Sequence, residues 1–206
     1  MSFYNGIVFS LTPPVAPATA WTFQIIYRFR GGVDGGLDGL LPSAGLALGT
    51  DGTLYGTTYE GGGTGCGGSG CGTVFSVTPQ AQAGGPWTEA VLYSFQGSDD
   101  GLHPFALGAG LAIGPGGLLY GVTDQGGGTG CGGGGCGVLF LVSPPATTGG
   151  TWTESILHTF TGGDDGQNPS FAPAIDPTGV VYGTAQGGAG TSCQSAGCGV
   201  VFQYIP

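Results

Sequence analysis

The sequence predicts an all-β protein with three four-stranded, antiparallel, blade-like repeats, β-propeller-like or β-prism-like, plus one surplus terminal strand. Three observations lead to this prediction. Four short apolar motifs recur, and the Phe of one of them stands at positions 9, 75, 140 and 202, which are 66, 65 and 62 residues apart. Glycine and proline contribute 49 and 14 of the 206 residues and separate the motifs. With 40% hydrophobic and only 7% charged residues, the chain also differs from disordered proteins, which are polar and charged.

Each motif is rich in β-branched and aromatic residues and bounded by turn residues, as strands are. The V-F strand occurs at residues 6–13, 72–79, 137–144 and 199–206. The W-T strand begins at Trp21, Trp87 and Trp152. The A-G-L strand begins at Ala44 and Ala109 and is degraded at 172–175, and the Y-G strand surrounds Tyr55, Tyr120 and Tyr182. In the W-T strand both alternating sets of side chains are partly apolar, which predicts that its sheet lies between two others.

The connections favour an antiparallel meander. The segments 48–53 and 113–118 are tight turns with glycine at positions that need a positive φ. A longer glycine-rich loop follows each Y-G strand and contains a C-x4-C pair, giving Cys66/Cys71, Cys131/Cys136 and Cys193/Cys198. We expect three small disulfides, and therefore an extracellular or cell-surface location. Each closes a short loop, so each should add stability at the low end of roughly 2–4 kcal/mol.

The repeats define a single repeat domain over residues 1–206. Residues 1–20 hold a V-F strand and a proline-rich linker, and the repeats span 21–79, 80–144 and 145–206. This gives thirteen strands, because the V-F strand occurs at both ends of the chain. If a repeat sheet begins with the W-T strand, the N-terminal V-F strand is surplus; if it begins with the V-F strand, the C-terminal one is.

Charge excludes several classes of function. The net charge is −10, lysine is absent, and the two cations are Arg28 and Arg30. We therefore expect no nucleic-acid partner. No apolar run approaches the roughly 18 residues needed to cross a bilayer, so we also expect no membrane insertion. The glycine runs lack the helix and lysine of a phosphate-binding loop. The first residues show no basic segment followed by an apolar core, so we expect the start to be that of a mature chain, a fragment or a mis-called reading frame.

The motifs LYGTT (54–58), GGG (61–63), GTVF (72–75) and VLYSF (91–95) together resemble the GloVer tandem repeat of bacterial surface and secreted proteins. The resemblance extends over about three repeats, nearly the whole chain. It implies export and propeller-like β repeats, and it implies no established activity and no catalytic residues.

A surplus apolar strand without charge favours addition to the sheet of another copy. We therefore expect the structural subunit of an extracellular filament that assembles head to tail, with copies of itself as its partner. The assembly residues would come from the two terminal V-F strands: Ile7, Val8, Phe9, Leu11, Val200, Val201 and Phe202. Two alternatives are a fifth strand in its own sheet and a chain cut from a longer array.

Other candidate sites have simpler explanations. Trp21, Trp87 and Trp152 could form sugar-stacking platforms of a secreted lectin, with glycans as partners, although large aromatics also pack between sheets. Acidic turns at 34–39, 98–101 and 163–166 could begin a calcium site, although Asp-Gly is ordinary turn chemistry. We favour the turn and expect no cofactor. His103 and His158 are not repeat equivalents, and Glu89 and Glu154 are near-duplicates, so we expect no enzyme.

Overall fold

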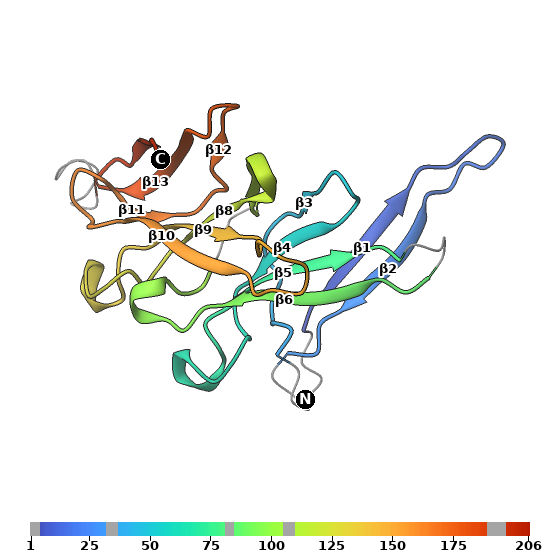
Figure 1. Ribbon diagram of the computed structural model, residues 1–206, viewed down its shortest axis with the longest axis horizontal. Helices are drawn as coiled ribbons and strands as arrows, with labels where there is room; N and C mark the ends of the chain where they lie inside the picture. The colour runs from blue at the N-terminus through green and yellow to red at the C-terminus, as the bar shows by residue number, and fades with distance from the viewer. Residues whose placement is uncertain (1–4, 32–36, 81–84, 105–109, 189–196) are drawn as a thin grey trace.

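A computed structural model describes residues 5–31, 37–80, 85–104, 110–188 and 197–206 (Figure 1). Its strands form four antiparallel sheets that follow one another along the molecule. Sheet I contains β1 (Ile7–Thr12) and β2 (Thr22–Arg28). Sheet II contains β3 (Ala47–Leu48), β4 (Leu54–Thr58), β5 (Thr73–Thr78) and β6 (Thr88–Ser94). Sheet III contains β7 (Ala112–Ile113), β8 (Leu119–Thr123), β9 (Val138–Ser143) and β10 (Thr153–Thr159). Sheet IV contains β11 (Gln167–Pro169), β12 (Ala174–Ile175), β13 (Val181–Gly187) and β14 (Val200–Tyr204).

Helical structure in the described residues is confined to single 3-10 turns. These are η2 (Cys66–Gly68), η3 (Ser98–Asp100), η4 (Pro115–Gly117) and η5 (Cys131–Gly133). Within the described ranges, no helix is long and apolar enough to cross a membrane. The all-β prediction is therefore confirmed.

The division of strands among sheets differs from both predicted phases. Each complete sheet contains the A-G-L, Y-G and V-F strands followed by the W-T strand of the next repeat, in the orders β3-β4-β5-β6 and β7-β8-β9-β10. Instead of three sheets of one repeat each, the described residues form two sheets with all four strand types, sheets II and III. The end sheets I and IV each lack at least one of these types in the described residues. The V-F and W-T strands stay together because they form a direct hairpin, whereas the acidic turn after the W-T strand leads into the next sheet.

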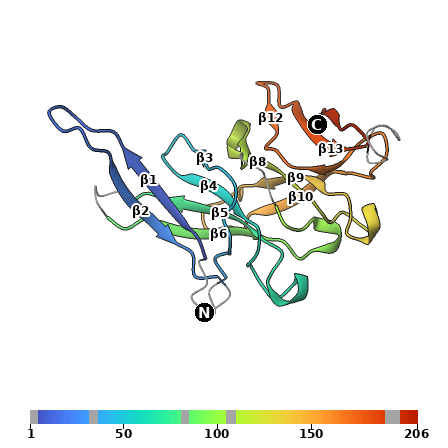
Figure 2. The same ribbon diagram turned by 180° about the vertical axis from the view of Figure 1, so that it is seen from behind.

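Both terminal V-F strands, either of which was predicted as the surplus strand, are paired. β1 is hydrogen-bonded to β2 over the whole length of the N-terminal hairpin, with a bulge between Val8 and Phe9. In sheet IV, β13 pairs with β14 on one edge and with β11 and β12 on the other. β11 falls outside the four repeated motifs and was not predicted. Figure 2 shows the hairpin and sheet IV at opposite ends of the molecule.

Successive sheets pack face to face through a repeated pair of phenylalanines. The Phe that ends each W-T strand meets the Phe of the V-F strand in the next sheet, edge to face. The pairs are Phe29–Phe75 at 5.0 Å, Phe95–Phe140 at 5.1 Å and Phe160–Phe202 at 5.1 Å between ring centroids. Three buried clusters, one per junction, surround these pairs. The prediction that strands lie between neighbouring sheets is confirmed.

Two of the predicted disulfides are present, Cys66–Cys71 and Cys131–Cys136. Cys198 is also disulfide-bonded, whereas Cys193 lies outside the described residues. Both described bridges close the tip of a glycine-rich loop after a Y-G strand. Cys71 and Cys136 are fully buried, so each bridge ties its loop to the adjoining core.

Candidate functional site

Each junction between sheets contains a repeated polar pair. Near the end of a W-T strand, a tyrosine or histidine points to an aspartate in the turn that follows. Tyr27 Oη donates to Asp38 Oδ2 at 2.6 Å, and Tyr93 Oη donates to Asp100 Oδ2 at 2.8 Å. In the third copy His158 Nε2 lies 3.1 Å from Asp165 Oδ2. The pair was not predicted, although the Tyr or His two residues before each Phe is visible in the sequence.

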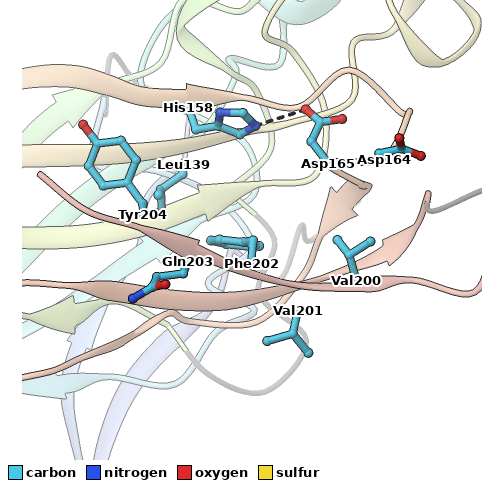
Figure 3. Close-up of a pocket in the computed structure, with 9 residues that line it drawn as sticks. All are labelled: Leu139, His158, Asp164, Asp165, Val200, Val201, Phe202, Gln203 and Tyr204. Atoms are coloured by element: carbon cyan, nitrogen blue, oxygen red, sulfur yellow. Dashed lines mark hydrogen bonds and ion pairs between the residues drawn. The ribbon is translucent and has the colours of Figure 1, made fainter.

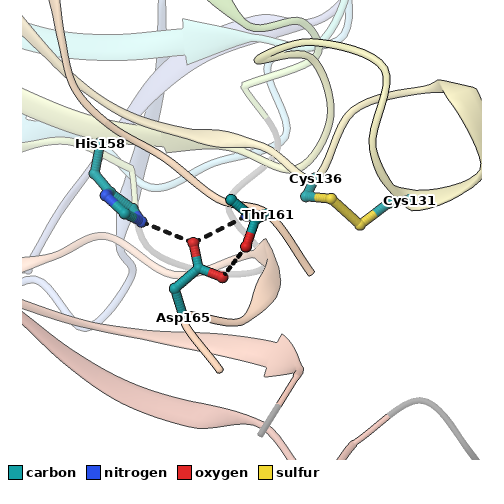
Figure 4. Close-up of polar contacts among 5 residues, drawn as sticks. All are labelled: Cys131, Cys136, His158, Thr161 and Asp165. Carbon is teal, nitrogen blue, oxygen red and sulfur yellow. Dashed lines mark hydrogen bonds and ion pairs between the residues drawn. A yellow bond between two sulfur atoms is a disulfide. The ribbon is translucent and has the colours of Figure 1, made fainter. Parts of the chain in front are cut away.

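The aspartate of each pair also holds its own turn. The backbone N–H groups of Arg30, Gln96 and Thr161 donate to Asp38, Asp100 and Asp165. Figure 4 shows Asp165 between His158 and Thr161, whose hydroxyl donates to it at 2.6 Å. The described part of the acidic turns is thus arranged as turn chemistry, and no metal-binding cluster occurs among the described residues. The segment 34–36 of the first turn lies outside them.

A carboxyl group from the next sheet faces the first two pairs. Glu89 Oε2 lies 3.4 Å from Tyr27 Oη, and the Asp100 charge acts on Glu154. Burial, reinforced by the charges of Asp38 and Asp100, raises the pKa of Glu89 and of Glu154 to about 7. One buried oxygen of each glutamate has no hydrogen-bond partner. Burial and the hydrogen bond to aspartate also raise the pKa of Tyr27 and Tyr93.

The third pair opens into a pocket instead. In sheets II and III the glutamate comes from β6 and β10, the W-T strands that pair with the V-F strand. Sheet IV has no such strand beside β14 in the described part of the chain. A pocket of about 190 Å3 lies here, and Figure 3 shows His158, Asp165, Val200, Phe202 and Tyr204 around it.

A second pocket lies at the other end of the molecule. It has a volume of about 310 Å3 and lies between β1 and the A-G-L segment of sheet II, lined by Val8, Phe9, Pro42 and Leu46 among others. Sheet I has no Y-G or A-G-L strand beside β1 in the described residues. Leu46 is consequently 41% exposed, whereas its repeat equivalent Leu111, which has a complete sheet before it, is 6% exposed.

The predicted assembly residues differ in burial according to the face on which they lie. Val8 is buried against Phe75 and Val77 of sheet II, whereas Phe9 on the opposite face is 54% exposed. In sheet IV, Val200 and Phe202 pack on sheet III, and Val201 is 81% exposed. Ile7 and Leu11 are also exposed.

The exposed residues have buried repeat equivalents. Phe9 corresponds to Phe75 and Phe140, and Val201 corresponds to Val74 and Leu139, all of which are fully buried. Each end of the array therefore exposes side chains of the kind that the chain buries between its own sheets.

The tryptophans do not form three equivalent platforms. Trp21 is exposed at the start of β2, whereas Trp87 and Trp152 pack against core clusters. The ring of Trp152 lies 6.3 Å from that of Tyr55 in the preceding sheet. His103 stacks on Tyr59 at 4.2 Å, and burial lowers its pKa. It lies in an irregular segment directly before Pro104, whereas His158 lies in β10, so the two histidines occupy different places in the repeat.

Comparison with known proteins agrees with the repeat organisation. A family model described as the Gloeobacter/Verrucomicrobia repeat matches residues 1–206. Neither the curated proteins nor the solved structures gave a match. The resemblance seen in the sequence motifs is therefore confirmed, and the chain belongs to the Gloeobacter/Verrucomicrobia repeat family.

Proposed function

We propose that the protein is a structural subunit of an extracellular filament and assembles head to tail by terminal β-strand addition. One observation carries this proposal: the two end sheets are incomplete in complementary ways. Sheet I has the V-F and W-T strands, and sheet IV has the A-G-L, Y-G and V-F strands. Joining the ends of two copies brings together all four strand types of a complete sheet.

The exposed end faces supply the driving force. Full burial of a valine or phenylalanine side chain stabilises by roughly 1.5–3 kcal/mol. Val201 is mostly exposed in the single chain, and its buried repeat equivalents Val74 and Leu139 show that the fold accommodates this side chain in its interior. A contact between two different ends is heterologous, so it continues as a filament unless it closes into a ring.

The small disulfides support a location outside the cytoplasm, where such bonds persist. We further propose that the role is not catalytic, because the polar pairs recur at each junction and serve the turns. A lectin built on three tryptophans is the weaker alternative, because two of the three rings are engaged in packing.

Electron microscopy and light scattering of the non-reduced protein test this proposal, with Val201→Asp as the diagnostic variant. We expect filaments from the unchanged protein and monomers from the variant, because the charge would enter the apolar junction. Val15→Asp is a matched control, since Val15 is 80% exposed but lies in the loop of the hairpin. Unchanged protein that remains monomeric, or Val201→Asp protein that still forms filaments, would contradict the proposal.

A further inference from the structure

We infer that β1 is a placeholder strand, which β14 of a second copy replaces when two copies join. The inference rests on the proposed assembly and specifies which strands pair, in which register and against which residues. In the joined state β2 of one copy pairs with β14 of the other. This forms a composite sheet with all four strand types, A-G-L, Y-G, V-F and W-T.

The exchange substitutes one V-F strand for another. β1 and β14 come from the same repeated motif, GIVFSLTP and GVVFQYIP. V-F and W-T strands pair in one register in all three hairpins, with Ser10 opposite Gln24, Ser76 opposite Ala90 and Leu141 opposite Ser155. Gln203 is the repeat equivalent of Ser10. The exchanged pair therefore places Gln203 opposite Gln24 of the second copy.

The backbone around β1 also has an equivalent at β14. Gly6 O accepts from Phe29 N, as Gly72 O accepts from Phe95 N and Gly137 O from Phe160 N. Gly6, Gly72 and Gly137 each begin a V-F motif, and Gly199 begins the fourth one. Gly6 lies against Pro42, where a Cβ would overlap the ring, and Gly199 shares its positive φ. Gly199 can therefore take the place of Gly6 beside Phe29 and Pro42 of the second copy.

The exchange fills the pocket beside β1. β14 brings β13 and β12 with it, and these are the strand types that sheet I does not contain in the described part of the chain. Val201 takes the position of Val8 against Phe75 and Val77 of the second copy. β12 and β13 cover the exposed Leu46, as sheet II covers Leu111 within the chain. Tyr182, exposed on the far face of sheet IV, approaches Trp87 as Tyr55 approaches Trp152.

The same step fills the pocket beside His158. Phe23 occupies the position that Glu89 and Glu154 hold in the other W-T strands, and it is largely exposed on β2. In the composite sheet its ring faces the His158–Asp165 pair and covers Phe202 and Tyr204, which line the pocket. The occupant of this pocket is thus an apolar ring, where the two internal junctions have a carboxyl group.

Cysteine cross-linking tests the register. A Gln203→Cys protein is mixed with a Gln24→Cys protein and oxidised under mild conditions, and the products are separated by non-reducing electrophoresis and mapped by mass spectrometry. We expect a disulfide between the two chains at these positions. Ala174→Cys is the control, because β12 lies on the other edge of β13 from β14. Filaments without the 203–24 bond would overturn the exchange while leaving assembly intact; monomers alone would overturn both proposals.

A locked hairpin gives an independent test. Ser10→Cys with Gln24→Cys links β1 to β2 within one chain, and Ser76→Cys with Ala90→Cys links the equivalent residues of β5 and β6. We expect the first lock to abolish filaments and the second to leave them unchanged. Circular dichroism verifies that both locked proteins are folded. Filament growth by the Ser10–Gln24 locked protein at the unlocked rate would overturn the exchange, but it would not contradict head-to-tail assembly.

Discussion

At the scale of single residues, the junctions between sheets differ in their charge. The first two contain a tyrosine, an aspartate and a glutamate, whereas the third contains His158 and Asp165. β6 and β10 hold Glu89 and Glu154 in partly buried positions beside an aspartate, and burial favours the neutral form of both glutamates. The charged form of each glutamate therefore destabilises the folded protein, and protonation removes this cost.

The stability of the fold should consequently fall as the pH rises from about 4.5 to about 7. In this window the folded chain keeps protons on Glu89 and Glu154 that the unfolded chain releases, so proton loss favours unfolding. We expect Glu89→Gln with Glu154→Gln to remove most of this fall and to stabilise the protein at pH 8, on the order of 1 kcal/mol per site because partial exposure screens the charge. Urea denaturation at pH 5 and pH 8 measures the effect, and identical pH dependence in the variant and the unchanged protein would refute it.

At the scale of elements, the Y-G strand depends on its glycine because an aromatic ring from the neighbouring strand lies over it. Gly121 lies beneath Phe140, and a Cβ there would overlap the ring atoms and also meet Leu111. Gly56 beneath Phe75 and Gly183 beneath Phe202 repeat the arrangement. In each sheet the V-F and Y-G strands thus fit together through a missing side chain.

Gly121→Ala should therefore destabilise the protein by about 1–3 kcal/mol, the range usual for overpacking a filled core. Thermal denaturation followed by circular dichroism measures the loss. Gly134→Ala serves as the control, because its backbone is in the right-handed helical region and a Cβ would meet only Gln125 Oε1, at 3.7 Å. Equal melting temperatures for the two variants would show that the ring does not need the glycine.

The sequence predicted these elements better than their grouping. All four strand types and their turns follow from local composition, since each motif is short, apolar and bounded by glycine or proline. Which strands share a sheet depends on whether a connection forms a hairpin or crosses to the next sheet. Glycine-rich connections do both, so their composition does not show which strands are grouped together. The Tyr–Asp pairs were missed for a similar reason: Tyr27 precedes Asp38 by 11 residues, His158 precedes Asp165 by 7, and the aromatic partner itself changes.

At the scale of the whole molecule, the chain is an array in which each sheet mainly contacts the sheets before and after it. Stability in such arrays comes from neighbouring units, and the end units need covering. Here the ends expose Phe9, Phe23, Tyr182 and Val201. The net charge of −10 acts in the opposite direction, because identical copies repel one another.

Salt should therefore promote assembly. The distance over which charges act falls from about 30 Å at 0.01 M ionic strength to about 10 Å at 0.1 M, so repulsion between copies weakens while the apolar contacts remain. We expect light scattering to grow faster at 0.2 M than at 0.01 M sodium chloride, and Val201→Asp protein to show no growth at either. Slower growth in higher salt would indicate ion pairs between copies and would contradict an apolar junction.

The position of the two arginines has a separate consequence for proteolysis. Arg28 ends β2 and Arg30 follows it, and the chain has no lysine and no other arginine. A protease that cleaves after basic residues can therefore cut only at the boundary between the N-terminal hairpin and sheets II to IV. Such cleavage would separate β2, the W-T strand that we propose to join two copies, from the fragment that contains residues 31–206. Trypsin sensitivity thus reports directly on whether that boundary is accessible in solution or covered in a filament.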